Sequence, residues 1–396
     1  MSNGAVLFLR KRQRCYPEML RLLTVGSVPP EDGGTTTGGV AKIHGLLIDH
    51  WLKRNDCPDF CLSGVVAPNR PPDGHDNFRG IIPFVSLPRE GSRQQESYLR
   101  ALDERHIDVV LFHHIGHRFV DWHVKRAAHI PAVGLIHSWT QVLIADNIAR
   151  NAKRERLQFH LSQMKWLTAP SEYTFQQGRA LGFEYTSPCE AIYNAIDPRI
   201  NNQVQKTQDS TLKRRGIAFV GALNEIKRPE FVIRAAAAVG LPLVIVGDGP
   251  RRAELERLAE RVRARTTIRF EGQQPAERIA DILMSSQMLC VPSTSEGLAN
   301  VYWEALACGT PIVGFAPNVA ELSRVLDIPV GEPVSGDAEL DEVIRAVERV
   351  RDSPWKSDEL KQRAANCNTV PICAQRYAEV VRKAVEASMS TSSGEV

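Results

Sequence analysis

The stretch Ser295–Gly314, SEGLANVYWEALACGTPIVG, decides the fold of the second half of the chain. It predicts a loop, a short helix over 301–307 with Asn300 as its N-cap, and a buried strand over 311–315. Gly309 fits the turn that ends a helix, and the proline two residues later prevents the helix from continuing. Further strands alternate with helices on both sides of this stretch, so the sequence predicts an α/β fold with parallel sheets.

Two glutamates in this stretch suggest a binding site. Glu296 lies in the loop and Glu304 in the helix, and Gly297 lets the backbone approach a ligand closely. The N-terminus of a helix carries free N–H groups and a partial positive charge, which stabilise an anion, and carboxylates accept hydrogen bonds from hydroxyl groups. The pattern therefore favours a site for a diphosphate and a sugar. The spacing alone leaves open that both glutamates are ordinary surface charges of a helix.

The same stretch resembles the signature of the retaining nucleotide-sugar glycosyltransferases of family 4. The resemblance implies the GT-B fold, in which two doubly wound Rossmann-like domains face a cleft and a C-terminal helix crosses back to the N-terminal domain. It also implies that Glu296 contacts the transferred sugar and Glu304 contacts the ribose of the nucleotide. The donor-binding backbone that it implies consists of Gly297, Leu298, Ala299 and Asn300.

A lysine after the predicted strand at 217–223 is the second part of the resemblance. The family places a lysine at the position of Lys227 that holds the donor diphosphate, a task suited to a compact point charge. A solvated loop lysine is the alternative. The family also has an arginine five positions earlier, where this chain has Ala222, and Arg228 is the candidate to replace it in donor binding. Loss of a phosphate cation weakens catalysis, so a non-catalytic homologue that acts as a binding partner stays an alternative.

A glycine-rich loop joins the strand predicted at 19–28 to the helix predicted at 40–51. Strand, glycine loop and helix place backbone amides against a phosphate. The loop lacks the GxGxxG pattern, which argues against a nicotinamide dehydrogenase. The family carries a paired glycine here, and Gly38 and Gly39 match it as donor-binding residues, although a flexible surface turn has the same composition.

His137 ends the strand predicted at 131–136. Ligands of open α/β sheets gather at the carboxyl ends of strands, and His137 matches a family histidine near the sugar and phosphate. With Lys227 and Glu296 it completes the catalytic set that the resemblance implies, while a packing histidine is the alternative. Three further histidines at 113, 114 and 117 have no accompanying carboxylate motif, so no metal is predicted.

The whole chain has 396 residues, of which 43% are hydrophobic and 24% charged, with a net charge of +3. These values predict two globular domains and no nucleic-acid partner. Eight scattered cysteines without a CxxC pair indicate reduced thiols. No stretch approaches the ~20 apolar residues of a membrane span, so a cytoplasmic protein is expected. The basic residues at 10–14 add the alternative of peripheral contact with the inner face of a membrane.

The predicted boundaries follow from composition and from the resemblance. They are an N-terminal tail at 1–18, an acceptor-binding domain at 19–200, a linker at 201–215, a nucleotide-sugar-binding domain at 216–370, a crossover helix at 371–388 and a disordered tail at 389–396. Within the first domain, a long helical stretch is predicted over 142–164 and Ser171 is predicted to cap the next helix.

The predicted function is transfer of a hexose, with retention, from a UDP-, GDP- or ADP-sugar to a glycan or glycolipid acceptor in polysaccharide or glycoconjugate biosynthesis. Neither a cofactor nor a metal is expected. A nucleotide-sugar epimerase or hydrolase with the same fold is an alternative. The sequence does not identify the sugar, the base, the acceptor or the oligomeric state.

Overall fold

The computed structural model describes residues 19–32, 34, 39–53, 60–68, 77–78, 82–85, 87–88, 91–143, 147–207, 214–262 and 264–392. The predicted tail at 1–18, with its basic residues, and Gly38 lie outside these ranges. The chain forms two compact units. The first consists of Met1–Pro170, Thr174–Ile192 and Cys373–Val396, and the second of Ser171–Tyr173 and Tyr193–Ile372.

The first unit contains a six-stranded parallel sheet with the strand order β2-β1-β5-β6-β7-β8. Its strands are β1 (Leu20–Val25), β2 (Phe60–Val66), β5 (Val109–Phe112), β6 (Ala132–Leu135), β7 (Trp166–Ala169) and β8 (Cys189–Ala191), beside a short antiparallel pair of β3 (Asn77–Phe78) and β4 (Ile82–Pro83). Its helices are η1 (Pro30–Asp32), α2 (Gly39–Lys53), α3 (Gly91–Glu104), α4 (Arg118–Arg126), α5 (Thr140–Leu143), α6 (Asn147–Gln163), most of α7 (Glu172–Ala180) and most of α16 (Val370–Ser392).

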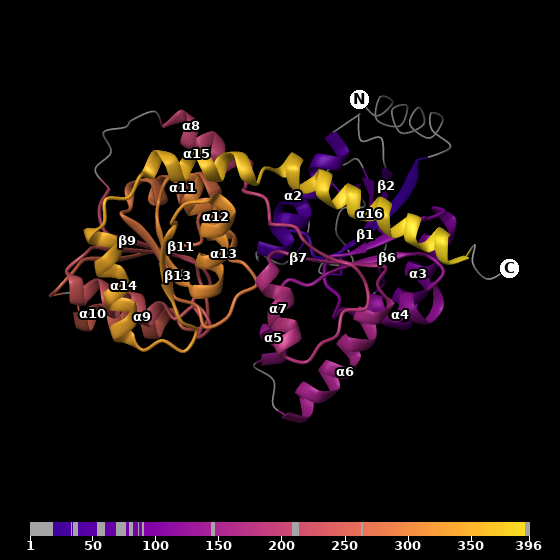
Figure 1. Cartoon of the computed structure of the whole chain (residues 1–396), viewed down its shortest axis with the longest axis horizontal. Helices are drawn as coiled ribbons and strands as arrows, with labels where there is room; N and C mark the ends of the chain where they lie inside the picture. Colours follow the sequence, from indigo (N-terminus) through magenta and orange to yellow (C-terminus); the bar gives the residue numbers. More distant parts are fainter. Residues whose placement is uncertain are drawn as a thin grey trace. The chain divides into compact units, whose positions relative to one another are not determined.

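Helices cover both faces of this sheet, as Figure 1 shows for α3 and α4 on one side and α2 and α16 on the other. Central strands with both faces covered must be apolar throughout, and β5 is buried at every position. Because successive side chains of an extended chain point to opposite faces, Phe112 joins the core beneath α3 and α4 whereas His113 lies near Tyr377 of α16.

The second unit contains another six-stranded parallel sheet, with the order β11-β10-β9-β12-β13-β14. Its strands are β9 (Ile217–Val220), β10 (Leu243–Val246), β11 (Ile268–Gly272), β12 (Met288–Val291), β13 (Ile312–Phe315) and β14 (Gly331–Val334). Its helices are α8 (Pro198–Lys206), α9 (Pro229–Val239), α10 (Arg252–Val262), α11 (Ala276–Ser285), α12 (Asn300–Ala307), α13 (Ala316–Leu326), α14 (Leu340–Asp352) and α15 (Ser357–Cys367). Helices α9, α10 and α14 pack together, and α8, α11, α12, α13 and α15 form the other layer (Figure 1). Both units are therefore doubly wound, as predicted.

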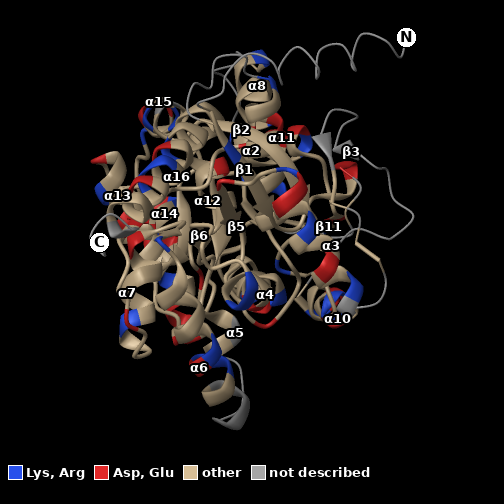
Figure 2. Ribbon diagram, turned by 90° about the vertical axis from the view of Figure 1, so that its right-hand side faces the viewer, with Lys and Arg blue, Asp and Glu red and all other residues tan. Residues whose placement is uncertain are grey.

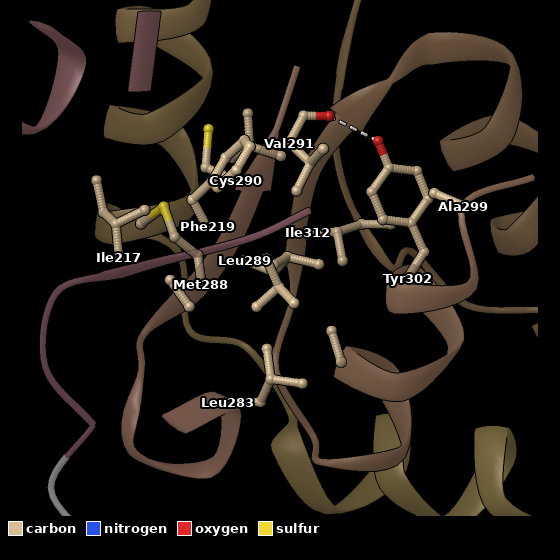
Figure 3. Packing of buried hydrophobic residues seen from close by; sticks show 14 of the residues in the cluster. Ile217, Phe219, Leu283, Met288, Leu289, Cys290, Val291, Ala299, Tyr302 and Ile312 are labelled. Atoms are coloured by element: carbon tan, nitrogen blue, oxygen red, sulfur yellow. Dashed lines mark hydrogen bonds between the residues drawn. The ribbon is translucent and has the colours of Figure 1, made fainter. Parts of the chain in front are cut away.

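Tyr302 fixes α12 to the centre of this sheet. Its side chain is completely buried, and its hydroxyl donates to the carbonyl of Val291 at the end of β12 over 2.7 Å (Figure 3). The same oxygen accepts from the amide of Phe315, at the end of β13, over 2.9 Å. The two strand ends beside the loop at 292–299 are thus held by one side chain of the helix that follows the loop.

Two local predictions were wrong. The expected linker at 201–215 contains the end of α8, which begins with Asp197 as N-cap and Pro198 as first residue and packs on α11. The helical stretch expected at 142–164 is described in two parts, α5 and α6, and residues 144–146 lie outside the described ranges. The tail expected to be disordered from 389 is helical as far as Ser392.

No helix among the described residues is long and apolar enough to cross a membrane. Acidic and basic side chains are interspersed on the outer helices, as on α10 in Figure 2. There, Arg251 pairs with Glu254 over 2.7 Å and Arg252 with Glu256 over 2.9 Å.

Candidate active site

The loop before α12 leaves backbone amides free. The N-cap of α12 is Ala299, and no side chain caps the helix. Asn300, predicted to be the N-cap, is instead the first helical residue, and its Oδ1 accepts from Nδ2 of Asn194 over 2.8 Å. Among the described residues, the amides of Gly297, Leu298 and Ala299 have no hydrogen-bond acceptor. Unpaired N–H groups at the positive end of a helix dipole can bind an anion.

Lys227 and Glu296 face each other across neighbouring loops. Strand β9 pairs with β12, so the loops that follow these strands lie side by side. The Lys227 ammonium forms an ion pair with Glu296, and the two side chains are 19% and 14% exposed. The backbone amide of Lys227 donates to Oδ1 of Asn224 over 3.1 Å, which fixes the turn that carries it. The ion pair is thus partly shielded from water yet remains accessible.

Glu304 is the fifth residue of α12, about one turn after its start, and is 6% exposed. A carboxylate is seldom buried to this extent on a helix unless it has partners, and Glu304 has partners in this structure. Together with burial, which is the larger cause, Glu304 raises the pKa of the neighbouring Cys308 to about 12, so that thiol stays protonated.

Arg228, predicted to contact the donor, makes its hydrogen bonds inside the second unit. Its backbone has a φ of 48°, in the left-handed region, and its side chain turns into the protein. The guanidinium donates to the carbonyl of Pro292 over 2.5 Å, of Ala338 over 2.8 Å and of Ser335 over 2.9 Å. Each guanidinium nitrogen thus already donates to a backbone carbonyl, which argues against the predicted role of Arg228 in donor binding. Ala222, at the position of that arginine, is exposed.

The turn after β10, Gly-Asp-Gly-Pro, touches the loop that carries Lys227. Gly247 has a φ of 124°, and a Cβ at this position would overlap the carbonyl oxygen of Gly221. The amide of Leu223 donates to the carbonyl of Asp248 over 3.0 Å. Glycine is therefore required at 247 for two backbone loops to approach each other at the carboxyl end of the sheet.

In the first unit, His137 follows β6 among other buried histidines. Its ring is hydrogen-bonded with the backbone of His113, whereas its Nε2 is buried without a partner in the described structure. Burial and the nearby histidines lower the pKa of His137 to about 3, so it is neutral at pH 7. A proton on Nδ1 leaves the Nε2 lone pair free to accept from a hydroxyl group.

Two further features of this unit bear on the sequence prediction. Gly39 is the exposed first residue of α2. The ring of His44, from the same helix, lies 4.0 Å from that of His113, centroid to centroid, and its Nε2 is bonded with the hydroxyl of Thr24 over 2.8 Å. The helical pattern at 40–51 gave no sign of this histidine pair, because contact between α2 and the end of β5 depends on the order of the strands.

The structure therefore assembles Lys227, Glu296, the loop at 297–299 and Glu304 in the second unit. His137 and Gly39 belong to the first unit. Sequence reasoning missed the polar side chains that hold this loop, Ser171 and Asn318, which both bond the carbonyl of Gly297.

Comparison with known proteins identifies the class. The profile described as Glycosyltransferase Family 4 matches residues 39–200, and the profile described as Glycosyl transferases group 1 matches residues 202–322. Both profiles describe glycosyltransferases and together they cover most of the chain, which therefore belongs to the glycosyltransferases.

Relatives and solved structures agree with the assignment. D-inositol 3-phosphate glycosyltransferase of Mycolicibacterium smegmatis is 26% identical over 350 residues, which cover 81% of this chain and 79% of that protein. The protein of the same name from Rhodococcus erythropolis is 38% identical over 109 residues, 24% of this chain and 25% of its own.

Two solved structures share the fold. Sucrose-phosphate synthase from Thermosynechococcus elongatus superposes with a TM-score of 0.71 and 17% identity, over 93% of this chain and all of that one. HepE of Anabaena in complex with UDP superposes with a TM-score of 0.67 and 16% identity, over 91% of this chain and 99% of that one. The fold is thus GT-B, as predicted, and the chain is a glycosyltransferase of the GT-B type.

Proposed function

We propose that this glycosyltransferase transfers a hexose, with retention of configuration, from a nucleotide-diphosphate sugar to a hydroxyl group of a glycan or glycolipid. The observation that carries the proposal is the pairing of Lys227 with Glu296 beside the unpaired amides at the start of α12. A cation, oriented N–H groups and a carboxylate then lie together where a diphosphate and a sugar would meet. HepE, which shares the fold, is solved with UDP and with UDP-glucose, which supports a nucleotide-sugar donor.

The ion pair gives a simple account of donor binding. Without a donor, Lys227 and Glu296 neutralise each other. A bound diphosphate competes for the ammonium of Lys227, and Glu296 is then free to accept hydrogen bonds from sugar hydroxyls. Lys227 and the amides of α12 stabilise the charge that grows on the departing diphosphate, which is usually the largest contribution to catalysis of this kind.

Two more residues have assigned roles in this mechanism. Glu304 accepts from the ribose hydroxyls, and the unprotonated Nε2 of His137 accepts from a hydroxyl of the substrate. Since no side chain of this set is an evident nucleophile, the leaving diphosphate is the base that deprotonates the acceptor on the same face of the sugar. The reaction proceeds without a metal or cofactor in this proposal.

The acceptor is the open part of the proposal. Relatives named D-inositol 3-phosphate glycosyltransferase make a phosphorylated cyclic polyol a second acceptor class to test beside glycans and glycolipids. Exposed Ala222 in place of the family arginine favours one alternative, a non-catalytic homologue that acts as a binding partner.

A thermal-shift panel tests the donor site. Wild type and Glu304→Ala are heated with UDP, GDP, ADP and their glucose conjugates, with Glu332→Ala, a surface carboxylate of the same unit, as control. A ligand at a concentration of a hundred times its dissociation constant stabilises the folded protein by about 2.7 kcal/mol. We expect one base to stabilise the wild type and the control, and to stabilise Glu304→Ala less.

Stabilisation by no nucleotide would refute the donor site. Product release from the stabilising conjugate, followed by NMR of the anomeric configuration with and without EDTA, then tests retention and metal independence. Binding without turnover would favour the inactive homologue.

A further inference from the structure

We propose that Ser171 and Asn318 are positioning residues that aim the amide of Leu298 at the donor diphosphate. The inference rests on the proposed function, because it concerns the same donor site. Its basis is the carbonyl of Gly297, which accepts two hydrogen bonds inside the second unit. Ser171 Oγ donates to it over 2.7 Å, and Asn318 Nδ2 donates over 3.0 Å.

Both donors are rigidly held. Ser171 and Asn318 are completely buried, and Gly297 is buried as well. Buried hydrogen bonds from two directions fix a carbonyl group much more strongly than a single exposed bond, because water does not compete for it.

The position of Ser171 is itself fixed from α13. Glu321 accepts from the amides of Glu172 and Tyr173 over 2.7 and 3.0 Å, and from the hydroxyl of Tyr193 over 3.0 Å. This carboxylate binds the first amides of α7, the helix that Ser171 was predicted to cap, and the serine hydroxyl donates to Gly297. Asn318 and Glu321 are three residues apart on α13 and therefore share one face of it. One helix face thus holds both the loop and the segment that restrains the loop.

The geometry of the peptide bond gives the consequence. In a trans peptide the C=O of one residue and the N–H of the next point in opposite directions, and no peptide bond in the described structure is cis. Since the carbonyl of Gly297 points at Ser171 and Asn318, the amide of Leu298 points away from them. That amide is one of those without an acceptor in the described structure. The two side chains therefore set the direction of an anion-binding N–H group without touching the ligand.

The binding of nucleoside diphosphates and monophosphates separates a positioning role from a general structural one. Isothermal titration with UDP and UMP, GDP and GMP, and ADP and AMP first finds the base that the full-length wild type binds. Loss of the hydrogen bond from Ser171 lets the peptide group between Gly297 and Leu298 change its direction. In the proposed site the Leu298 amide binds the phosphates and does not contact the nucleoside. We expect Ser171→Ala to raise the Kd of the nucleoside diphosphate roughly three- to tenfold, with the Kd of the monophosphate much less changed.

Ser286→Ala is the matched control. Ser286 is 3% exposed, lies in the same unit and donates to the carbonyl of Ile282 over 2.7 Å. The two variants lose the same kind of bond, so Ser286→Ala should leave both dissociation constants at their wild-type values. Asn318→Ala repeats the test if Ser171→Ala does not fold.

The possible results separate the inference from the function on which it rests. Absence of nucleotide binding by wild type would refute the proposed function. Binding by wild type with equal affinities in Ser171→Ala and Ser286→Ala, or an equal loss of diphosphate and monophosphate affinity, would refute the positioning role alone.

Discussion

Replacing Arg228 by methionine distinguishes a structural arginine from a phosphate-binding one. Methionine fills most of the volume but donates no hydrogen bond. The carbonyls of Pro292 and Ala338, whose bonds to Arg228 are buried, lose their donors, while that of Ser335, in a partly buried bond, can be hydrated. Leaving a buried acceptor unpaired costs about 1–3 kcal/mol. Two such groups predict a loss of roughly 4 kcal/mol in the free energy of unfolding of the second unit.

Calorimetry of the full chain measures this loss directly. For a domain of this size, 1 kcal/mol shifts the melting temperature by about 2–4 °C, so a decrease on the order of 10 °C is expected. Arg349→Met is the control, since Arg349 is 49% exposed and pairs with Glu332 over 2.6 Å at the surface, and such pairs contribute at most about 1 kcal/mol. Below its melting temperature, Arg228→Met should bind nucleotide as wild type does. An Arg228→Met variant that has the melting temperature of the control but no longer binds nucleotide would show that Arg228 binds the phosphates.

Two further predictions concern the stability of the separate units. Tyr302→Phe leaves the carbonyl of Val291 and the amide of Phe315 unpaired, which should cost about 2–4 kcal/mol and lower the melting temperature of the second unit alone. Acid should lower the stability of the first unit, because this unit contains all 11 histidines. Burial lowers the pKa of both His44 and His123 to about 4. Between pH 6.5 and pH 4 the unfolded chain therefore binds protons that the folded unit does not, so stability is complete above 6.5 and falls by about 1.4 kcal/mol per histidine and pH unit.

Hydrogen exchange read peptide by peptide checks both predictions, because it reports the two units separately. A uniform loss of protection in Tyr302→Phe would contradict the assignment of its bonds to one unit. Equal acid sensitivity of both units would contradict the histidine argument.

The elements that follow from apolar runs and glycine or proline boundaries were predictable. The strands predicted at 131–136, 217–223 and 311–315 occur as β6, β9 and β13, where the apolar runs place them. Helix α8 was missed, although Asp197 and Pro198 form a standard helix start, because its polar composition resembles that of a linker. This element was readable from the sequence.

The contacts of Arg228 and Asn300 could not be predicted from the sequence in the same way. Arg228 is next to Lys227 in the sequence, yet its left-handed backbone turns it towards carbonyls 64 to 110 residues away. Asn300 has the composition of an N-cap, but its amide partner Asn194 lies 106 residues earlier. Side-chain direction in loops depends on such distant partners, which local propensity does not contain. The same reason hid the contact between Ser171 and Gly297, which are 126 residues apart.

In the proposed donor site, Ala222 stands where the family that the sequence resembles has an arginine, which gives the oriented amides at the start of α12 more weight. Arg228 is committed to three carbonyls, so Lys227 is the cation that this loop offers to a diphosphate, and it must first leave Glu296. Breaking that ion pair offsets part of the energy that Lys227 gains from the phosphates. The amides of α12 have no such competitor among the described residues, and a preorganised dipole acts without reorganisation. On the proposed function, a donor site with one cation in place of two depends more on how firmly its peptide groups are aimed, which is the role that we propose for Ser171 and Asn318.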